Sequence, residues 1–134
     1  MAVESGTWTM VSSDGYGDYL KAVGVGMIQR NLAEKATPTI ELTGEGEAWT
    51  LKTLTPLRNH EVSFTLGAPV EHTGVEGRPA VSTFTIAGNR LIDIAIIDGD
   101  ESTAQTVYTF DGAEVKATFS AKGVTATRVY KTTT

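Results

Sequence analysis

The sequence contains no cysteine, which excludes a disulfide framework and catalysis by a thiolate. It contains two histidines, His60 and His72, and neither stands at a zinc-like spacing from a second metal ligand. No apolar run approaches the roughly 20 residues that cross a bilayer, and the first residues lack the apolar stretch of a signal peptide. We therefore expect a cytoplasmic protein without a metal site.

Motifs for catalysis and for binding nucleotides are also missing. The sequence has no Gly-x-Ser-x-Gly nucleophile motif, and the acidic residues at 98–101 lack the remaining positions of a calcium-binding EF-hand loop. The glycines at 24–26 and 44–46 do not link a strand to a helix as a phosphate-binding loop requires. Lys and Arg number 11 against 16 Asp and Glu, and the net charge of −5 disfavours a broad nucleic-acid-binding surface. We expect no enzyme activity, no cofactor and no nucleic-acid partner.

The beginning of the chain predicts one strand followed by two short helices. The strand is expected at residues 7–11, and residues 12–15 offer the side chains of a helix N-cap and turn. A second helix is expected at residues 27–36, because Pro38 disfavours helical geometry in the residue before it. The first helix is predicted by apolar residues at the i, i+3, i+4 and i+7 spacing of one helical face: Tyr16, Tyr19, Leu20 and Val23.

The rest of the chain predicts strands. Short segments rich in Thr, Val, Ile and Phe alternate with turn residues, a rhythm typical of an all-β sandwich or barrel. With the first strand they number about ten, and so many antiparallel strands in one domain leave exposed edges unless the sheet closes on itself. The centre of such a barrel is a candidate ligand cavity. The expected strands lie at residues 39–43, 48–55, 60–66, 70–73, 79–87, 90–97, 102–110, 113–121 and 124–132.

The length of 134 residues fits a single domain spanning residues 1–134. The two helices interrupt the strands once, between the first and the second, and so they could cap one end of a barrel.

The last expected strand carries the most informative polar residues. Strand alternation places Arg128 and Tyr130 on the same face, together with Ala126. If this face points into the barrel, the arginine needs an anion or ordered water, because its guanidinium does not lose its charge. A carboxylate fits this requirement, since the guanidinium can bind it bidentately and the phenol can add a hydrogen bond. The alternative is an arginine at the rim of an ordinary terminal strand.

Several segments resemble the fatty-acid-binding protein family. They occur in the family's order and spacing over nearly the whole chain. The segments are GTWTMVSS at 6–13, GYGDYLKAVGVG at 15–26, KATP at 35–38, RNHEVSFTLG at 58–67, DG at 98–99, KGVT at 122–125 and RVY at 128–130.

This resemblance implies an all-β fold, a ten-stranded antiparallel up-and-down barrel with a two-helix lid between the first and second strands. It implies an intracellular carrier that binds a long-chain fatty acid or a similar hydrophobic carboxylate inside the barrel. Arg128 and Tyr130 match two of the three residues that hold the carboxylate in the family. Trp8 matches a residue that marks the fold and is expected in the core.

The third family residue, an arginine, is missing here. Counting forward from the DG pair at 98–99 places its position at Thr106, and counting back from Arg128 places it at Val107 or Tyr108. Gln105 and Thr106 are therefore possible secondary polar contacts. Some family members with glutamine in this region favour retinoids, and so the ligand class stays open between fatty acids, retinoids and other lipids.

The resemblance also assigns residues to the cavity and its portal. We expect a monomer whose acidic surface allows at most transient, salt-sensitive contact with membranes. A barrel that has lost tight fatty-acid binding and serves as an interaction module is the remaining alternative. The expected cavity and portal residues are Tyr16, Tyr19, Leu20, Val25, Ala33, Ala36, Pro38, Thr53, Leu57, Val75, Arg78 and Phe119.

Overall fold

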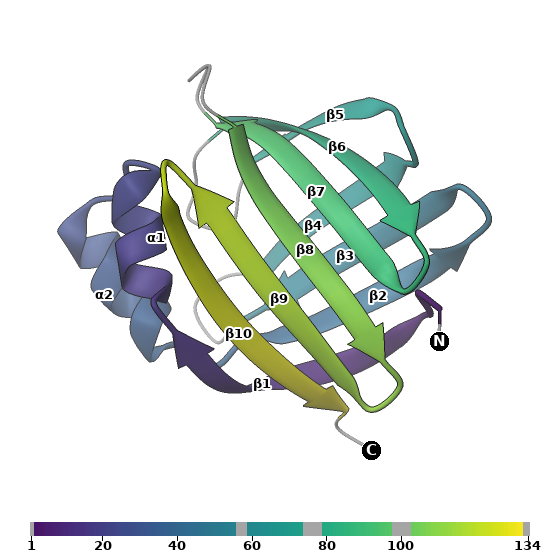
Figure 1. Cartoon of the computed structure of the whole chain (residues 1–134), viewed down its shortest axis with the longest axis horizontal. Coiled ribbons are helices and arrows are strands. Elements are labelled where there is room, and N and C mark those ends of the chain that lie inside the picture. The colour runs from purple at the N-terminus through teal and green to yellow at the C-terminus, as the bar shows by residue number, and fades with distance from the viewer. Residues whose placement is uncertain (1, 56–58, 74–78, 98–102, 133–134) are drawn as a thin grey trace.

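The computed structural model describes residues 2–55, 59–73, 79–97 and 103–132. Ten strands form one antiparallel sheet in the order β4-β3-β2-β1-β10-β9-β8-β7-β6-β5. The sheet curls into a nearly closed barrel, which confirms the predicted fold class (Figure 1). The strands are β1 (Gly6–Asp14), β2 (Thr39–Glu45), β3 (Ala48–Leu54), β4 (Asn59–Thr65), β5 (Pro69–Thr73), β6 (Pro79–Ala87), β7 (Arg90–Ile97), β8 (Thr103–Asp111), β9 (Glu114–Ala121) and β10 (Val124–Thr132).

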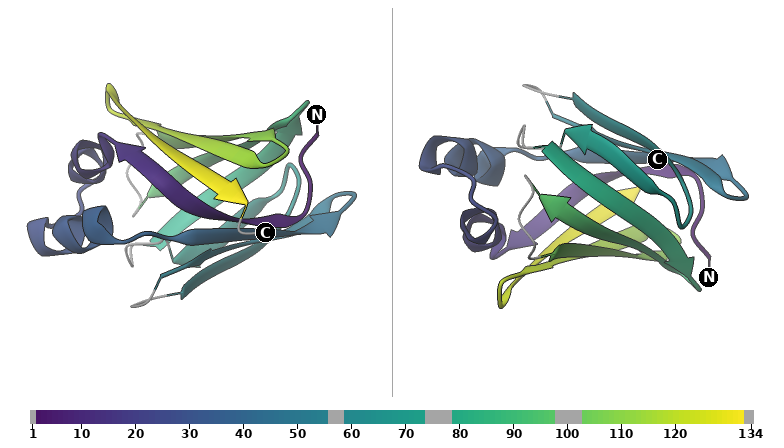
Figure 2. Two further views of the ribbon diagram at one scale, coloured as in Figure 1. Left: turned by 90° about the horizontal axis from the view of Figure 1, so that it is seen from below. Right: turned by 90° about the horizontal axis from the view of Figure 1, so that it is seen from above.

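Consecutive strands from β2 to β4 and from β5 to β10 pair with their neighbours in sequence, and β1 joins the two groups by pairing with both β2 and β10. The turned views show two facing layers of strands (Figure 2). The order ends at β4 on one side and β5 on the other, and among the described residues no ladder joins these two strands. The interior therefore lies between two layers that are least tightly linked where β4 meets β5.

The first strand is longer than the sequence pattern predicts. It runs from Gly6 to Asp14, not from residue 7 to 11, because its second half continues the ladder with β10 beyond a bulge between Met10 and Ser12. The expected N-cap chemistry at residues 12–15 is wrong in its detail. Gly15 is the N-cap residue, with a φ of 76° and no side-chain cap.

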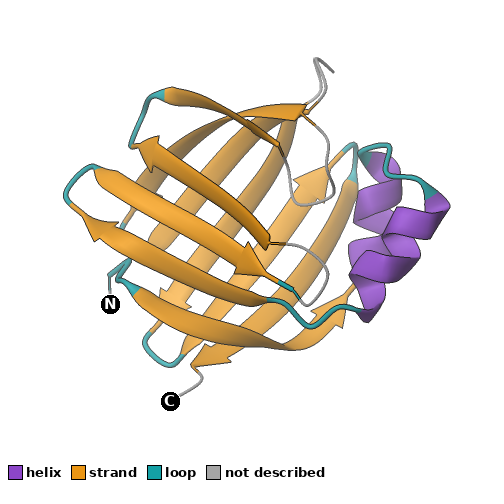
Figure 3. Ribbon diagram, turned by 180° about the vertical axis from the view of Figure 1, so that it is seen from behind, coloured by secondary structure: helices purple, strands orange, loops and turns teal. Residues whose placement is uncertain are grey.

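Two helices cover one end of the barrel (Figure 3). Helix α1 (Tyr16–Ala22) buries Tyr16, Tyr19 and Leu20, as its spacing predicts. Helix α2 (Met27–Lys35) has no fully buried residue, and it lies beside α1 at the same end of the barrel (Figure 2). None of the described helices has the length and apolarity that crossing a membrane demands.

Trp8 anchors the part of the core that closes the barrel. Its side chain is 4% exposed, and its ring meets the ring of Phe110 edge to face with 5.4 Å between centroids. The indole Nε1 donates a hydrogen bond to the Gly112 carbonyl at 3.2 Å. Such an aromatic pair contributes about 1 kcal/mol beyond the burial of its area. The expectation that Trp8 belongs to the core is confirmed.

Candidate functional site

The barrel encloses a cavity of about 120 Å³. Side chains from the lid helix α1 and from strands β3 to β9 line it. Its wall is mainly apolar, with a polar group formed by Thr53, His60, His72, Ser82, Asp93, Thr106 and Tyr108. This combination of an apolar wall and a few converging polar groups is typical of a small-molecule site.

Many of the expected cavity residues lie in this wall. Ala33 is half-buried against the core, Ala36 is half-buried and Pro38 is buried, but none of these three lines the cavity. Leu57, Val75 and Arg78 lie outside the described residues. The expected cavity residues that do line the cavity are Tyr16, Tyr19, Leu20, Val25, Thr53 and Phe119.

The two possible secondary contacts on β8 point in opposite directions. Thr106 is 7% exposed and faces inward, where it pairs with Asp93 on β7 and with Phe119 on β9. Gln105 is exposed on the outer face of the strand and does not reach the cavity. Strand alternation is the reason, because adjacent residues of a strand lie on opposite faces.

Arg128 and Tyr130 are both 3% exposed, on the inner face of β10. Arg128 Nε donates to the Ser13 hydroxyl at 3.0 Å, and Arg128 Nη2 donates to the Ala33 carbonyl at 3.2 Å. The guanidinium carbon lies 3.5 Å from the centre of the Tyr16 ring. These contacts tie β10 to β1 and to both lid helices. Neither Arg128 nor Tyr130 belongs to the cavity wall, and the Tyr16 ring contacts the guanidinium from the side of the cavity.

Tyr108 lies on the inner face of β8 and lines the cavity, although the family alignment left its register open. Burial raises the pKa of its phenol well above 10.0, and nearby Asp93, Tyr130 and Tyr19 raise it further. Tyr108 is therefore a neutral hydroxyl at physiological pH. Its phenol interacts electrostatically with Asp93 in the cavity wall and with Tyr130 on β10.

Four polar side chains from four consecutive strands form a hydrogen-bonded chain in the cavity wall. His60 Nε2 on β4 lies 3.2 Å from His72 Nδ1 on β5, and His72 Nε2 lies 2.8 Å from the Ser82 hydroxyl on β6. Ser82 in turn bonds to Asp93 on β7. The His60–His72 contact crosses the edge where β4 and β5 share no ladder among the described residues.

Burial changes the acid–base behaviour of this chain. It lowers the pKa of His60 below 6.5, with the neighbouring His72 as a smaller cause, and it lowers the pKa of His72 as well. Burial raises the pKa of Asp93 from 3.8 to about 6, against the opposing hydrogen bond from Ser82. Asp93 Oδ1 is buried and has no hydrogen-bond partner among the described residues. No cluster of three or more possible metal ligands occurs in the described part of the chain.

The sequence pattern did not identify this chain of side chains. His60 and His72 stand too far apart in sequence to predict a shared site, because their contact depends on how β4 and β5 meet. Asp93 had a signal. Alternation along β7 places it on the same face as Leu91 and Ala95, and a carboxylate on a buried face is unusual.

Comparison with known proteins places the chain in a family. A squid protein, sodium/calcium exchanger regulatory protein 1 of Doryteuthis pealeii, is 36% identical over 127 residues, which cover 95% of this chain and 94% of the squid protein. Fatty acid-binding protein homolog 5 of Caenorhabditis elegans is 34% identical over 127 residues and 93% of both chains. The chain belongs to the fatty-acid-binding protein family.

A solved structure agrees with this assignment. The fatty acid transporter REP1-NXSQ superposes with a TM-score of 0.89 at 33% identity, over 97% of this chain and 96% of that chain. No family model matches the sequence. As a member of the fatty-acid-binding protein family, the chain has a ten-stranded barrel with a two-helix lid.

Proposed function

We propose that this fatty-acid-binding protein carries one long-chain fatty acid, or a similar hydrophobic carboxylate, inside its barrel. The observation that carries the proposal is an enclosed, mainly apolar cavity next to a buried arginine, Arg128. The relative from Caenorhabditis elegans is named a fatty-acid-binding protein and the REP1-NXSQ structure a fatty acid transporter, which supports the same ligand class.

The carboxylate would bind to Arg128 and Tyr130. A guanidinium has five N–H donors, and the bonds to Ser13 and Ala33 use two of them. The remaining donors can hold a carboxylate once the Tyr16 ring moves aside. Tyr16 and Ala33 both belong to the lid. Binding of a carboxylate would therefore loosen the contacts of Arg128 with the two helices.

Tyr108 would take part of the role of the missing second arginine. It lies on the inner face of β8, one of the positions to which the family arginine maps, and it stays neutral at physiological pH because burial raises its pKa. A neutral phenol donates one hydrogen bond and supplies no charge. We therefore expect weaker attraction for carboxylates than two arginines would give.

The volume of the cavity sets a further condition. It measures about 120 Å³, below the roughly 300 Å³ at which typical ligand pockets begin. A long acyl chain thus requires aromatic side chains at the lid end, including Tyr19 and Phe119, to change their rotamers. Their rings contact each other with centroids 5.4 Å apart, one from the lid helix α1 and one from strand β9.

Native mass spectrometry of protein purified without detergent tests the proposal. A carrier should retain a fraction of molecules with a mass increase that collision removes as an intact fatty acid. A cavity that stays empty both after purification and after incubation with oleate would contradict it.

A second candidate is regulation of an ion exchanger through direct contact. The squid relative at 36% identity carries that activity in its name. Under this hypothesis the barrel would bind the exchanger whether or not lipid is present. Co-sedimentation of the lipid-free and the oleate-loaded protein with exchanger-containing membranes tests this hypothesis. Equal binding by both forms would support regulation independent of lipid. Binding by the loaded form alone would join regulation to lipid carriage. A cytoplasmic location, a monomeric state and the lack of enzyme activity remain predictions.

A further inference from the structure

Asp93 is a hydrogen-bond acceptor with an unused oxygen inside the cavity wall. Its Oδ1 atom is buried and has no partner among the described residues. A buried carboxylate oxygen without a donor is costly, because that oxygen has lost its bonds to water and gained none in return. The rest of the chain is satisfied, since His60, His72 and Ser82 are bonded to one another.

The direction of these hydrogen bonds follows from the carboxylate. When Asp93 is ionised it can only accept, and so the Ser82 hydroxyl donates to it. Ser82 Oγ then accepts from His72 Nε2–H, and His72 Nδ1 accepts from His60 Nε2–H. Both imidazoles are neutral in this arrangement, in agreement with their lowered pKa values. In this arrangement His60 Nε2–H, His72 Nε2–H and the Ser82 hydroxyl each already donate a hydrogen bond, and Asp93 Oδ1 still lacks a donor.

We propose that Asp93 is the centre of a second polar subsite, which binds a hydroxyl group borne by the chain of the lipid. Oδ1 would accept the hydroxyl hydrogen. This inference rests on the proposed carrier function, because the hydrocarbon around the hydroxyl would fill the apolar cavity. The preferred ligand class is therefore a hydroxylated fatty acid.

Other groups fit the subsite less well. A second carboxylate would meet the negative charge of Asp93, and a methylene group would leave Oδ1 without a donor. A ligand ammonium would satisfy the charge, but it would have to lose its own hydration in a wall formed otherwise by neutral and apolar side chains. A hydroxyl supplies the hydrogen at a smaller desolvation cost.

The strand register indicates where along the lipid the hydroxyl should lie. Asp93 pairs with Thr106, Thr106 with Phe119, and Phe119 with Ala126, two residues before Arg128. Asp93 on β7 and Arg128 on β10 are thus three strand spacings of about 4.8 Å apart, or about 14 Å measured along the curved sheet. A carboxylate at Arg128 and a hydroxyl at Asp93 therefore belong to distant carbons. The hydroxyl is expected near the middle of the chain and not beside the carboxyl group.

Competition binding with stearate and a series of hydroxystearates tests the subsite. The series carries the hydroxyl at successive positions from carbon 2 toward the middle of the chain. The wild type should bind one mid-chain isomer about tenfold more tightly than stearate, as expected for a hydrogen bond to a charged group. Asp93→Leu should abolish this preference, and Asp93→Asn should reduce it by several fold. Glu71→Gln, which removes a charge from an exposed residue of β5, is the control and should keep the preference.

The outcomes separate the subsite from the carrier function. If stearate and all hydroxystearates bind with equal affinity, or if Asp93→Asn keeps the full preference, the subsite is wrong and the carrier function stands. A preference spread evenly over all hydroxyl positions would also overturn it, because Asp93 occupies one place. If no lipid in the series binds, the carrier function fails and the subsite fails with it. Asp93→Asn keeps the shape of the side chain, and so it decides the question even if Asp93→Leu does not fold.

Discussion

His60 Nε2 on β4 and His72 Nδ1 on β5 lie 3.2 Å apart, and their contact spans the edge at which the order of the barrel strands ends. Stacked aromatic rings support the same edge, since Phe64 on β4 lies over Phe84 on β6 with 3.8 Å between ring centroids. Side chains thus connect strands that no backbone ladder joins among the described residues. The hydrogen bond from His60 requires a neutral His72 whose Nδ1 can accept it, and so this edge should respond to pH.

The histidine pair should weaken the folded state as the pH falls. Burial lowers both pKa values below 6.5, and so the unfolded chain takes up protons before the folded chain does. The contribution is complete above pH 6.5 and is lost as the pH falls through the lowered folded values. Between pH 7.5 and pH 5 the wild type should lose more unfolding free energy than the double variant His60→Gln/His72→Gln. Chemical denaturation at both pH values measures this, and identical losses would contradict the role of the pair.

Asp93 should have the opposite dependence. Its pKa rises from 3.8 to about 6 on folding, so its contribution is complete below pH 3.8 and is lost as the pH rises through 6. The full effect corresponds to about 3 kcal/mol. Asp93→Asn lacks this titration, and its stability relative to the wild type should increase from pH 4 to pH 7.5. Denaturant titrations of both proteins provide the test. A constant difference across this range would show that Asp93 is ionised at its ordinary pKa.

Arg128 should contribute to carboxylate binding and not to the binding of uncharged lipids. Replacing it with methionine keeps an apolar stem and removes the donors. Arg128→Met should weaken oleate binding about tenfold or more, because a charge-assisted hydrogen bond is lost. It should leave the affinity for oleyl alcohol nearly unchanged. Displacement of a fluorescent lipid measures both, and an equal loss for acid and alcohol would indicate that Arg128 acts through the fold alone.

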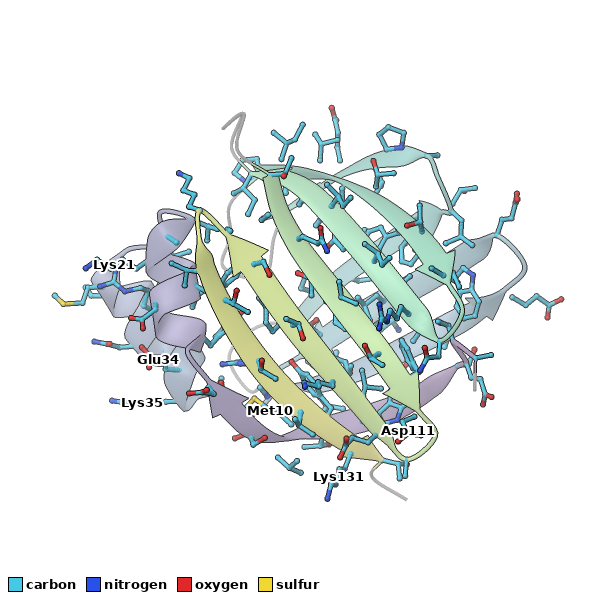
Figure 4. All side chains as sticks on the ribbon, viewed as in Figure 1. Met10, Lys21, Glu34, Lys35, Asp111 and Lys131 are labelled. Carbon is cyan, nitrogen blue, oxygen red and sulfur yellow. The ribbon has the colours of Figure 1, made fainter. Side chains whose placement is uncertain are left out.

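The exposed face of helix α2 should promote transfer to membranes. Helix α2 exposes apolar side chains, Met27 at 65% and Ile28 at 74%, and the lysines Lys21 and Lys35 project from the lid away from the barrel (Figure 4). The double variant Met27→Ser/Ile28→Ser should slow the transfer of a fluorescent fatty acid to phosphatidylserine vesicles several fold. High salt should slow the wild type as well.

Val81→Ser is the matched control for this experiment, because Val81 is an exposed apolar residue of β6, far along the chain from the lid. It should transfer lipid at the wild-type rate. A rate independent of vesicle concentration in all three proteins would indicate diffusion through water and contradict a role for the lid surface.

Most of the fold follows from the local pattern. The strands after Pro38 begin and end within about two residues of their expected positions, because alternating side chains and turn residues are local signals. The extension of β1 to Asp14 is not local. It depends on the ladder with β10, whose partner residues, such as Arg128 opposite Ser13, lie at the other end of the chain.

The candidate site follows the sequence less closely. Strand alternation places Arg128 and Tyr130 on one face of their strand, and the structure shows that this face is the inner one. Alternation does not show that the Arg128 side chain turns toward Ser13 and Ala33, because those contacts depend on how the lid sits on β10. The chain from His60 to Asp93 needs the curvature of four strands, and no spacing in the sequence reports it.

Isothermal titration of the delipidated protein with oleate tests the central claim most directly. An internal carrier predicts saturation at one oleate per chain, with a negative heat-capacity change from the burial of the acyl chain. It also predicts that oleate protects the backbone amides of β7 to β10 from hydrogen exchange. Absence of saturable binding, or binding without any protection of these strands, would contradict carriage of a lipid inside the barrel.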